Sequence, residues 1–237
     1  MTTLLLVRHG RTEANANGTL AGRSPGVALD ATGKEQAAAL GERMAGLTLT
    51  RIVVSPLERC QQTAEVVFGQ RTAEQYRIDE RLTECDYGTW TGRPLKELAD
   101  EPLWARVQNH PSSVVFPEGE ALADVAARGV GALREHDRHV AEQSGPNALW
   151  AVVTHGDLIK AVLADALGMH VDLFQRIVVD PCSVSVLRYT SHRPFVLRMN
   201  DVGGDLRALE PKPEDEDAQS DSDAAVGGGT GTTSSTT

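Results

Sequence analysis

Short, uninterrupted apolar runs alternate along this chain with longer segments in which apolar positions recur every three or four residues. Residues 4–7, 52–54 and 151–153 contain only Leu, Ile, Val or Ala, which is typical of strands buried on both faces of a parallel sheet. The longer segments predict helices near residues 31–45, 57–68, 94–109, 121–142 and 157–167. This alternation favours an α/β fold, a three-layer αβα sandwich with helices on both faces of a mostly parallel sheet.

Two later runs predict a hairpin at the end of the sheet. They are Cys182–Tyr189 and Pro194–Asn200, and four polar residues separate them. These strands would add antiparallel character to the otherwise parallel sheet. We therefore expect a single domain over residues 1–207.

Residues 208–237 differ in composition from the rest of the chain. They hold seven acidic residues and one lysine, a net charge of −6, which leaves −4 of the formal −10 for residues 1–207. With almost nothing apolar to bury, this acidic, Gly/Ser/Thr-rich tail is expected to be disordered. No basic stripe or aromatic platform is present, so a nucleic-acid partner is not expected.

Residues suited to anion chemistry follow two of the apolar runs directly. The first run ends in Arg8-His9-Gly10 and the third in Thr154-His155-Gly156. Ligands of open α/β sheets bind outside the carboxyl ends of the strands, so these residues are expected at the lip of one crevice. Gly10 is expected to permit a sharp turn and to bring backbone N–H groups close to an anion.

The second run is followed by a helix start and, further on, by an acidic loop. Ser55 is a favourable N-cap and Pro56 a favourable first helical residue, which places Arg59 in the first turn. The loop at residues 81–88 offers carboxylates close to an aromatic residue and a glycine. All these segments are expected to meet at one edge of the sheet.

As a set, these motifs resemble the histidine phosphatase superfamily, in the branch of cofactor-dependent phosphoglycerate mutases and related phosphatases. The resemblance covers roughly residues 2–200 and is carried by Arg8-His9-Gly10-Arg11-Thr12 with Asn15, Ser55-Pro56-Leu57 with Arg59 and Gln62-Thr63-Ala64, Glu84 with Tyr87-Gly88, and Thr154-His155-Gly156. One position departs from the family pattern. Members often have Gly-Gly-Glu-Ser before a long helix, and Ala121 stands here in place of the serine.

The resemblance implies a phosphomonoesterase that works through a phosphohistidine intermediate on His9. A phosphoryl group carries about two negative charges near pH 7, which repel a nucleophile until they are neutralised. Arg8 and Arg59 would supply that charge, because the guanidinium fork matches phosphate oxygens in pairs. His155 would add a third donor from the opposite side. The arginines take the place of Mg²⁺ in this scheme, so neither a metal nor another cofactor is expected.

The resemblance assigns proton transfer to Glu84, three residues before Tyr87. A buried glutamate next to a phosphate dianion has a raised pKa and can hold a proton near neutrality. Asp86 is the rival, only two positions away. Glu84→Gln should slow turnover of a poor leaving group and spare an activated aryl phosphate.

The substrate is expected to be a small phosphorylated metabolite. Candidate substrate-binding residues from the motifs and their neighbours are Arg11, Thr12, Asn15, Ala21, Gly22, Tyr87 and Gly156. The sequence does not identify the phosphoester.

Two alternative functions remain. A phosphoglycerate mutase-type phosphomutase uses the same pocket, but mutases resemble each other in a long insert with paired arginines. Only 70 residues separate Glu84 from His155, without an Arg-Arg pair, whereas Tyr87 is shared with mutases. An inactive module that binds phosphorylated ligands is the second alternative, and the presence of all the motif residues counts against it.

Further features favour a cytoplasmic protein. The first apolar run is only four residues long, and no stretch reaches the ~18 apolar residues of a membrane span. The three cysteines lack metal or redox spacing, which is typical of reduced thiols. Oligomeric state remains open, as does the regulation of the site through Cys60 or Cys85, which adjoin Arg59 and Glu84.

Overall fold

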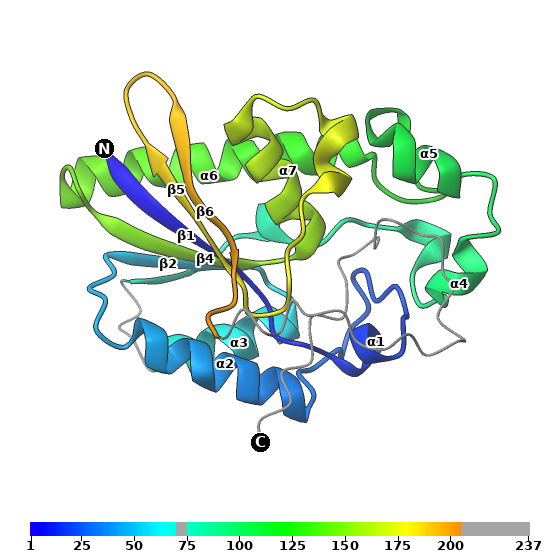
Figure 1. The fold of residues 1–237 in the computed structure, drawn as a ribbon, viewed down its shortest axis with the longest axis horizontal. Coiled ribbons are helices and arrows are strands. Elements are labelled where there is room, and N and C mark those ends of the chain that lie inside the picture. Colours follow the sequence, from blue (N-terminus) through cyan, green and yellow to red (C-terminus); the bar gives the residue numbers. More distant parts are fainter. Residues whose placement is uncertain (70–74, 205–237) are drawn as a thin grey trace.

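The predicted strands assemble into one sheet in this computed structural model, which describes residues 1–69 and 75–204. The sheet has six strands in the order β3-β2-β4-β1-β5-β6 (Figure 1). Their bounds are Thr2–Arg8 for β1, Arg51–Val54 for β2, Tyr76–Ile78 for β3, Leu149–Thr154 for β4, Val184–Tyr189 for β5 and Pro194–Asp201 for β6. The expected tail at 208–237, with its domain boundary, lies outside the described residues.

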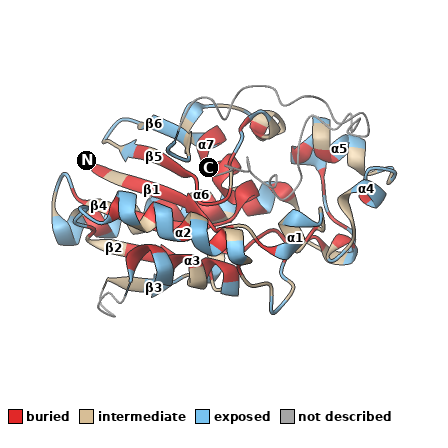
Figure 2. Ribbon diagram, turned by 60° about the horizontal axis from the view of Figure 1, so that its bottom comes forward, coloured by how far each residue is buried: buried red, intermediate tan, exposed pale blue. Residues whose placement is uncertain are grey.

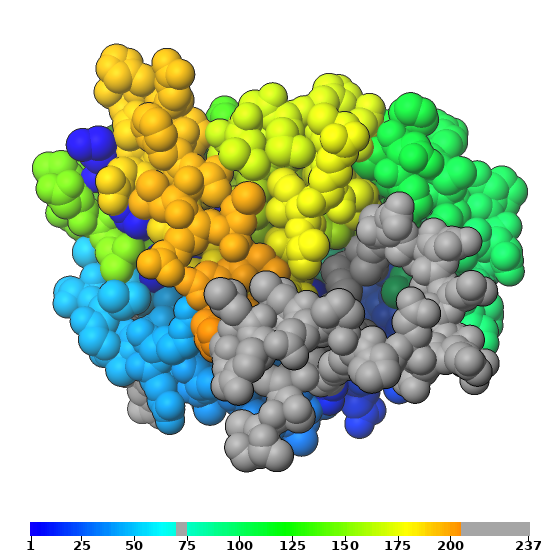
Figure 3. Space-filling view, in the orientation of Figure 1, coloured from blue at the N-terminus to red at the C-terminus, as the bar shows by residue number. Residues whose placement is uncertain are grey.

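Strand directions confirm the mostly parallel sheet and the hairpin. β4 pairs in parallel with β1 and β2, and β2 in parallel with β3. β5 is antiparallel to both β1 and β6. The hairpin extends beyond the neighbouring elements in the space-filling view (Figure 3).

The helices agree with the prediction in four of five places. Their bounds are Glu13–Ala16 for α1, Ala31–Met44 for α2, Glu58–Phe68 for α3, Leu95–Leu98 for α4, Trp104–Asn109 for α5, Leu122–Ser144 for α6 and Gly156–Leu167 for α7, with short 3-10 turns at Glu80–Leu82 (η1), Gly88–Trp90 (η2), Pro111–Ser113 (η3) and Val171–Arg176 (η4). The single helix expected over 94–109 is wrong, since α4 and α5 are separate. Pro102 lies between them, and proline removes a backbone donor and disfavours helical geometry in the residue before it.

Alternation along the buried strands divides the core in two, as the three-layer prediction requires. On β1, Leu4 and Leu6 pack with α6 and α7, while Leu5 and Val7 pack with α2 and α3. Both sets are buried because the sheet is covered on both faces, and the central strands are accordingly red in Figure 2. Among the described residues, no helix combines the length and apolar character of a membrane span.

The predicted N-cap of α3 is wrong, although the helix begins within one residue of the predicted range. The helix begins at Glu58, and its N-cap position is Leu57, which has no side-chain cap hydrogen bond. Ser55 does not cap this helix, because its hydroxyl instead contacts a ring nitrogen of His155 at 2.7 Å. Arg59 still lies in the first turn, as expected.

Candidate active site

Strand register brings the motif residues together. Arg8 on β1 pairs with Thr154 on β4, and Val54 on β2 pairs with Val153 on β4. His9, His155 and Ser55, the residues that follow these strands, therefore lie at one edge of the sheet. The five predicted catalytic residues meet there, and each is at most 3% exposed: Arg8, His9, Arg59, Glu84 and His155.

The ring of His9 is oriented by two contacts. Its Nδ1 lies 2.8 Å from the carbonyl oxygen of Gly10, which can only accept, so Nδ1 carries the hydrogen. Its Nε2 lies 3.3 Å from Nε of Arg59, which can only donate, so Nε2 presents a lone pair. Burial, followed by the charges of Arg59 and Arg8, lowers the pKa of His9 well below its usual value. The ring is therefore neutral, and the lone pair on Nε2 faces the guanidinium.

Gly10 serves a different purpose from the one expected. Its N–H donates to Oγ1 of Thr63 at 3.0 Å, so this amide is already engaged within the protein. A Cβ atom at position 10 would lie 2.7 Å from the carbonyl oxygen of Gly33. The glycine is needed because the start of α2 approaches the backbone closely.

Arg59 connects the two histidines. Its second terminal nitrogen donates to the carbonyl oxygen of Gly22 at 2.8 Å and lies 3.3 Å from Nδ1 of His155. The His9 and His155 ring centroids are 5.3 Å apart. One guanidinium thus contacts both imidazoles.

His155 is neutral, and its Nδ1 accepts from Arg59. Burial, with the charge of Arg59, lowers its pKa well below the usual value. Nε2 bonds to Ser55, and Nδ1 faces Arg59. A phosphate dianion bound nearby would favour the imidazolium, in which Nδ1 is a donor.

Glu84, rather than Asp86, lies in this cluster. One Glu84 oxygen accepts from the N–H of Cys85 at 2.9 Å, and the other is 3.8 Å from Nδ1 of His155. Burial, with the negative charge of Asp157, raises the pKa of Glu84 to about 7. The Asp86 side chain is 43% exposed and faces Arg23.

Sequence reasoning missed the arginine that holds the Glu84 loop. Arg128 on α6 donates to the carbonyl oxygens of Arg81 and Thr83 at 2.7 and 2.8 Å, and to that of Glu84 at 3.2 Å. It also forms an ion pair with Glu120 at 2.6 Å. A cation on a long amphipathic helix gives no sequence signal for such a role.

Three of the expected substrate-binding residues form hydrogen bonds or ion pairs within the protein: Arg11, Thr12 and Asn15. Arg11 pairs with Asp30 at 2.8 Å and donates to Thr32, which ties it to the start of α2. Thr12 and Asn15 form a capping box at the N-terminus of α1. These contacts give all three side chains a structural role.

The remaining expected substrate-binding residues surround the cluster more closely. Ala21 and Gly22 form a turn whose carbonyl receives the Arg59 bond. Tyr87 is fully buried and donates to Asp157 at 2.8 Å, and Gly156 is the first residue of α7.

The cysteines near the site are shielded. Cys60 and Cys85 are fully buried, and burial raises the pKa of both thiols, that of Cys60 to about 12. Since the thiolate is the reactive form, neither is set up for oxidation. Over the described ranges 1–69 and 75–204, no group of three His, Cys, Asp or Glu side chains is arranged to hold a metal ion.

Comparisons with known proteins point to one family. A family model described as histidine phosphatase superfamily (branch 1) matches residues 4–202. The chain is 31% identical over 182 residues to the uncharacterized phosphatase PhoE of Bacillus subtilis, covering 77% of this chain and 86% of that protein. It is also 31% identical over 191 residues to the probable phosphoglycerate mutase GpmB of an Enterobacter species, covering 80% and 86%. Among solved structures, YhfR of Bacillus stearothermophilus superposes with a TM-score of 0.77 at 28% identity, covering 86% of this chain and 98% of that one.

Proposed function

The chain belongs to the histidine phosphatase superfamily, and we propose that it hydrolyses phosphate monoesters of small metabolites through a phosphohistidine on His9. One observation carries this proposal. A neutral histidine presents its lone pair to a guanidinium inside a buried cluster that also holds a protonatable glutamate. Those are the parts that a covalent phosphoryl transfer requires.

In the first step, Arg8 and Arg59 hold the phosphoryl oxygens and offset their charge. Nε2 of His9 forms a bond to phosphorus as the bond from phosphorus to the ester oxygen breaks. Glu84 gives its proton to that oxygen, so the alcohol leaves neutral and Glu84 becomes a carboxylate. The carbonyl of Gly10 keeps the Nδ1 proton in place and stabilises the positive charge that develops on the ring.

In the second step, the Glu84 carboxylate takes a proton from water as the water oxygen bonds to phosphorus. The bond from phosphorus to Nε2 breaks, inorganic phosphate forms, and His9 returns to its neutral state. Glu84 is then protonated again for the next cycle. The same residue acts as acid and base in turn, which a pKa of about 7 permits.

Hydrolysis is favoured over a phosphomutase reaction by the segment between Glu84 and His155. It spans only 70 residues and contains no Arg-Arg pair for a substrate carboxylate. A mutase must also shut out water while it holds the intermediate. The relative named as a probable phosphoglycerate mutase keeps the mutase reaction as the alternative.

Rapid-quench labelling tests the proposal. A ³²P-labelled phosphate ester should leave an acid-labile, base-stable label on the wild type and none on His9→Ala. Absence of label on the wild type would make the protein a module that only binds phosphorylated ligands. Interconversion of 2- and 3-phosphoglycerate much faster than phosphate release would identify a mutase.

A further inference from the structure

Helix α7 carries a buried ion pair directly after His155. Asp157 is 1% exposed and Lys160 3%, and the lysine Nζ lies 3.6 Å from Oδ1 of the aspartate. Most other buried residues of this helix are apolar. A buried ion pair adds little stability over apolar residues of similar size, so packing alone does not explain it.

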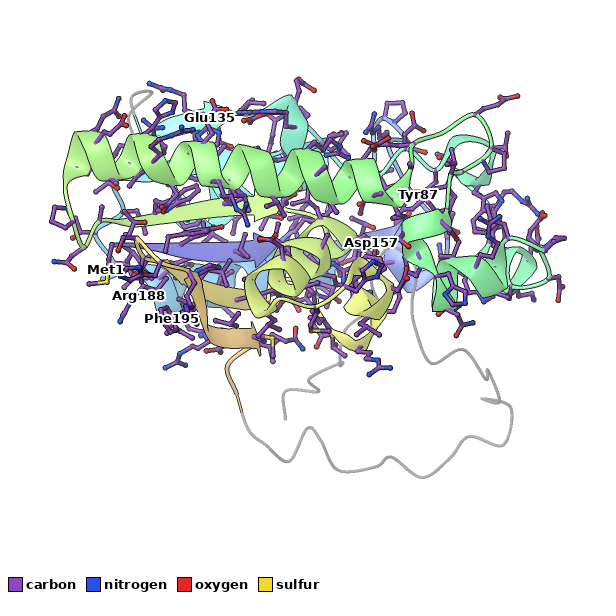
Figure 4. The ribbon with its side chains drawn as sticks, turned by 90° about the horizontal axis from the view of Figure 1, so that it is seen from above. Met1, Tyr87, Glu135, Asp157, Arg188 and Phe195 are labelled. Atoms are coloured by element: carbon purple, nitrogen blue, oxygen red, sulfur yellow. The ribbon has the colours of Figure 1, made fainter. Side chains whose placement is uncertain are left out.

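Asp157 faces the loop that carries Glu84. The hydroxyl of Tyr87, three residues after Glu84, donates to Oδ2 of Asp157 at 2.8 Å. Seen from above, these two residues lie together where α7 begins, at the end of the sheet opposite Met1 and Phe195 (Figure 4). The negative charge of Asp157 disfavours the ionised form of Glu84 and is, after burial, the main cause of its raised pKa.

Lys160 also contacts a second element, η4. Its Nζ donates to the side-chain carbonyl of Gln175 on η4 at 2.9 Å and lies 5.8 Å from the ring centroid of Phe174. Lys160 thus contacts both Asp157 and Gln175, and its positive charge opposes the negative charge of the aspartate. A cation here also favours the ionised form of Glu84 directly.

We propose that Asp157 and Lys160 are positioning residues with opposite effects on Glu84: Asp157 keeps the acid protonated, and Lys160 limits that effect. This inference rests on the proposed function, in which Glu84 gives its proton to the leaving oxygen. Two arginines surround Glu84 and favour the carboxylate. Asp157 counteracts them, so that a proton donor exists near neutral pH.

Other ionisable groups also face Glu84, and they come from every element packed against it. They are Arg8 at the end of β1, Arg59 and Cys60 of α3, His155 before α7, Arg128 of α6 and Arg23 at the Glu84 backbone carbonyl, and Cys85 and Tyr87 of its own loop. None of these residues is itself replaced in the Asp157 and Lys160 variants, and asparagine at position 157 can still accept from Tyr87. A difference in the Glu84 titration between these variants therefore measures the effect of Asp157 and Lys160.

The test compares Asp157→Asn with Lys160→Met. Asparagine retains a carbonyl oxygen to accept from Tyr87, and methionine retains an unbranched chain. Asp165→Asn is the matched control, since Asp165 lies on the same helix, is 37% exposed and pairs with Arg134. Carbon NMR titration of the Glu84 carboxyl measures its protonation. The pH profile of kcat for an alkyl phosphate measures how turnover depends on that protonation.

We expect the Glu84 titration midpoint to move down by about one pH unit in Asp157→Asn and upward in Lys160→Met. Asp165→Asn should leave the midpoint in place. The inference is overturned if both buried variants move it in the same direction, or if neither moves it while kcat falls, which is the result of a merely structural role. The NMR midpoint is independent of catalysis. If it moves as expected while Glu84→Gln hydrolyses alkyl phosphates at the wild-type rate, the proposed proton donor is wrong and the effect of the α7 pair on Glu84 stands.

Discussion

Nε of Arg59 lies 3.3 Å from Nε2 of His9, the ring atom that faces away from the Gly10 carbonyl. The guanidinium therefore donates to the lone pair on Nε2. It fixes the tautomer of His9 and disfavours protonation of the ring. In the proposed mechanism, phosphate oxygens accept from the guanidinium in place of His9, and the lone pair is then free to attack phosphorus.

Replacing Arg59 with lysine should reduce kcat/KM for an aryl phosphate by about 10²-fold or more. An ammonium group lacks the planar fork that contacts His9, His155 and the Gly22 carbonyl together. Steady-state kinetics measures the loss. Arg134→Lys, on the exposed face of α6, is the control and should retain wild-type kinetics. If Arg59→Lys has the same kinetics as the wild type, Arg59 takes no part in the reaction.

Glu84→Gln should slow hydrolysis of an alkyl phosphate by at least about tenfold and that of p-nitrophenyl phosphate far less. An alkoxide leaves poorly without a proton, whereas nitrophenolate needs none. Asp86→Asn should leave both substrates nearly unaffected, because Asp86 is half exposed and faces Arg23. If Asp86→Asn shows the leaving-group dependence instead, the assignment of the acid is wrong.

Hydrolysis of an alkyl phosphate should decline as pH rises through about 7. Glu84 has a raised pKa, so its protonated form is abundant below that pH and is lost above it. The low-pH limb should lie well below the usual histidine range, because burial and two arginines lower the pKa of His9. A kcat/KM profile recorded between pH 4 and 9, which reports ionisations of the free enzyme, tests both limbs. Activity that rises from pH 6 to 8 would contradict the sign of this prediction.

Arg128→Met should lower the free energy of unfolding by about 2–3 kcal/mol, because Glu120 and three carbonyl oxygens lose a charged donor. It should also reduce kcat by roughly tenfold, because the Glu84 loop is no longer held against α6. Urea unfolding and steady-state kinetics measure the two effects. Arg138→Met, an exposed position on the same helix, should change neither.

The native protein should resist thiol reagents. Its three free cysteines are buried, and burial raises the pKa of each thiol. Reaction with Ellman's reagent at pH 8 should be slow in the native state and yield three thiols after unfolding in guanidinium. Rapid reaction of Cys60 in the native state, located by peptide mapping, would instead support redox regulation of the site.

Much of the fold can be predicted from local sequence. The runs at 4–7, 52–54 and 151–153 predict buried strands because a strand covered on both faces needs no polar positions. The helix at 31–45 and the hairpin at 182–200 follow from periodicity and from polar residues at the turn. The family, and with it His9, Arg59 and His155, follows from motifs that are contiguous in the chain. Their catalytic roles remain predictions.

Tertiary structure decided what depends on partners far away in the chain. The local sequence predicts that Ser55 caps a helix, whereas in the structure its hydroxyl contacts His155, 100 residues later. In the sequence, Asp157 is only an acidic residue at the start of α7. The structure shows that Tyr87, 70 residues earlier, donates a hydrogen bond to it. Local propensity reflects the conformations of a few adjacent residues, whereas the charge around Glu84 is set by the register of β1 against β4 and by the packing of α3, α6 and α7. Only the assembled sheet brings those groups into a common low-dielectric interior, where each one changes the protonation of the others.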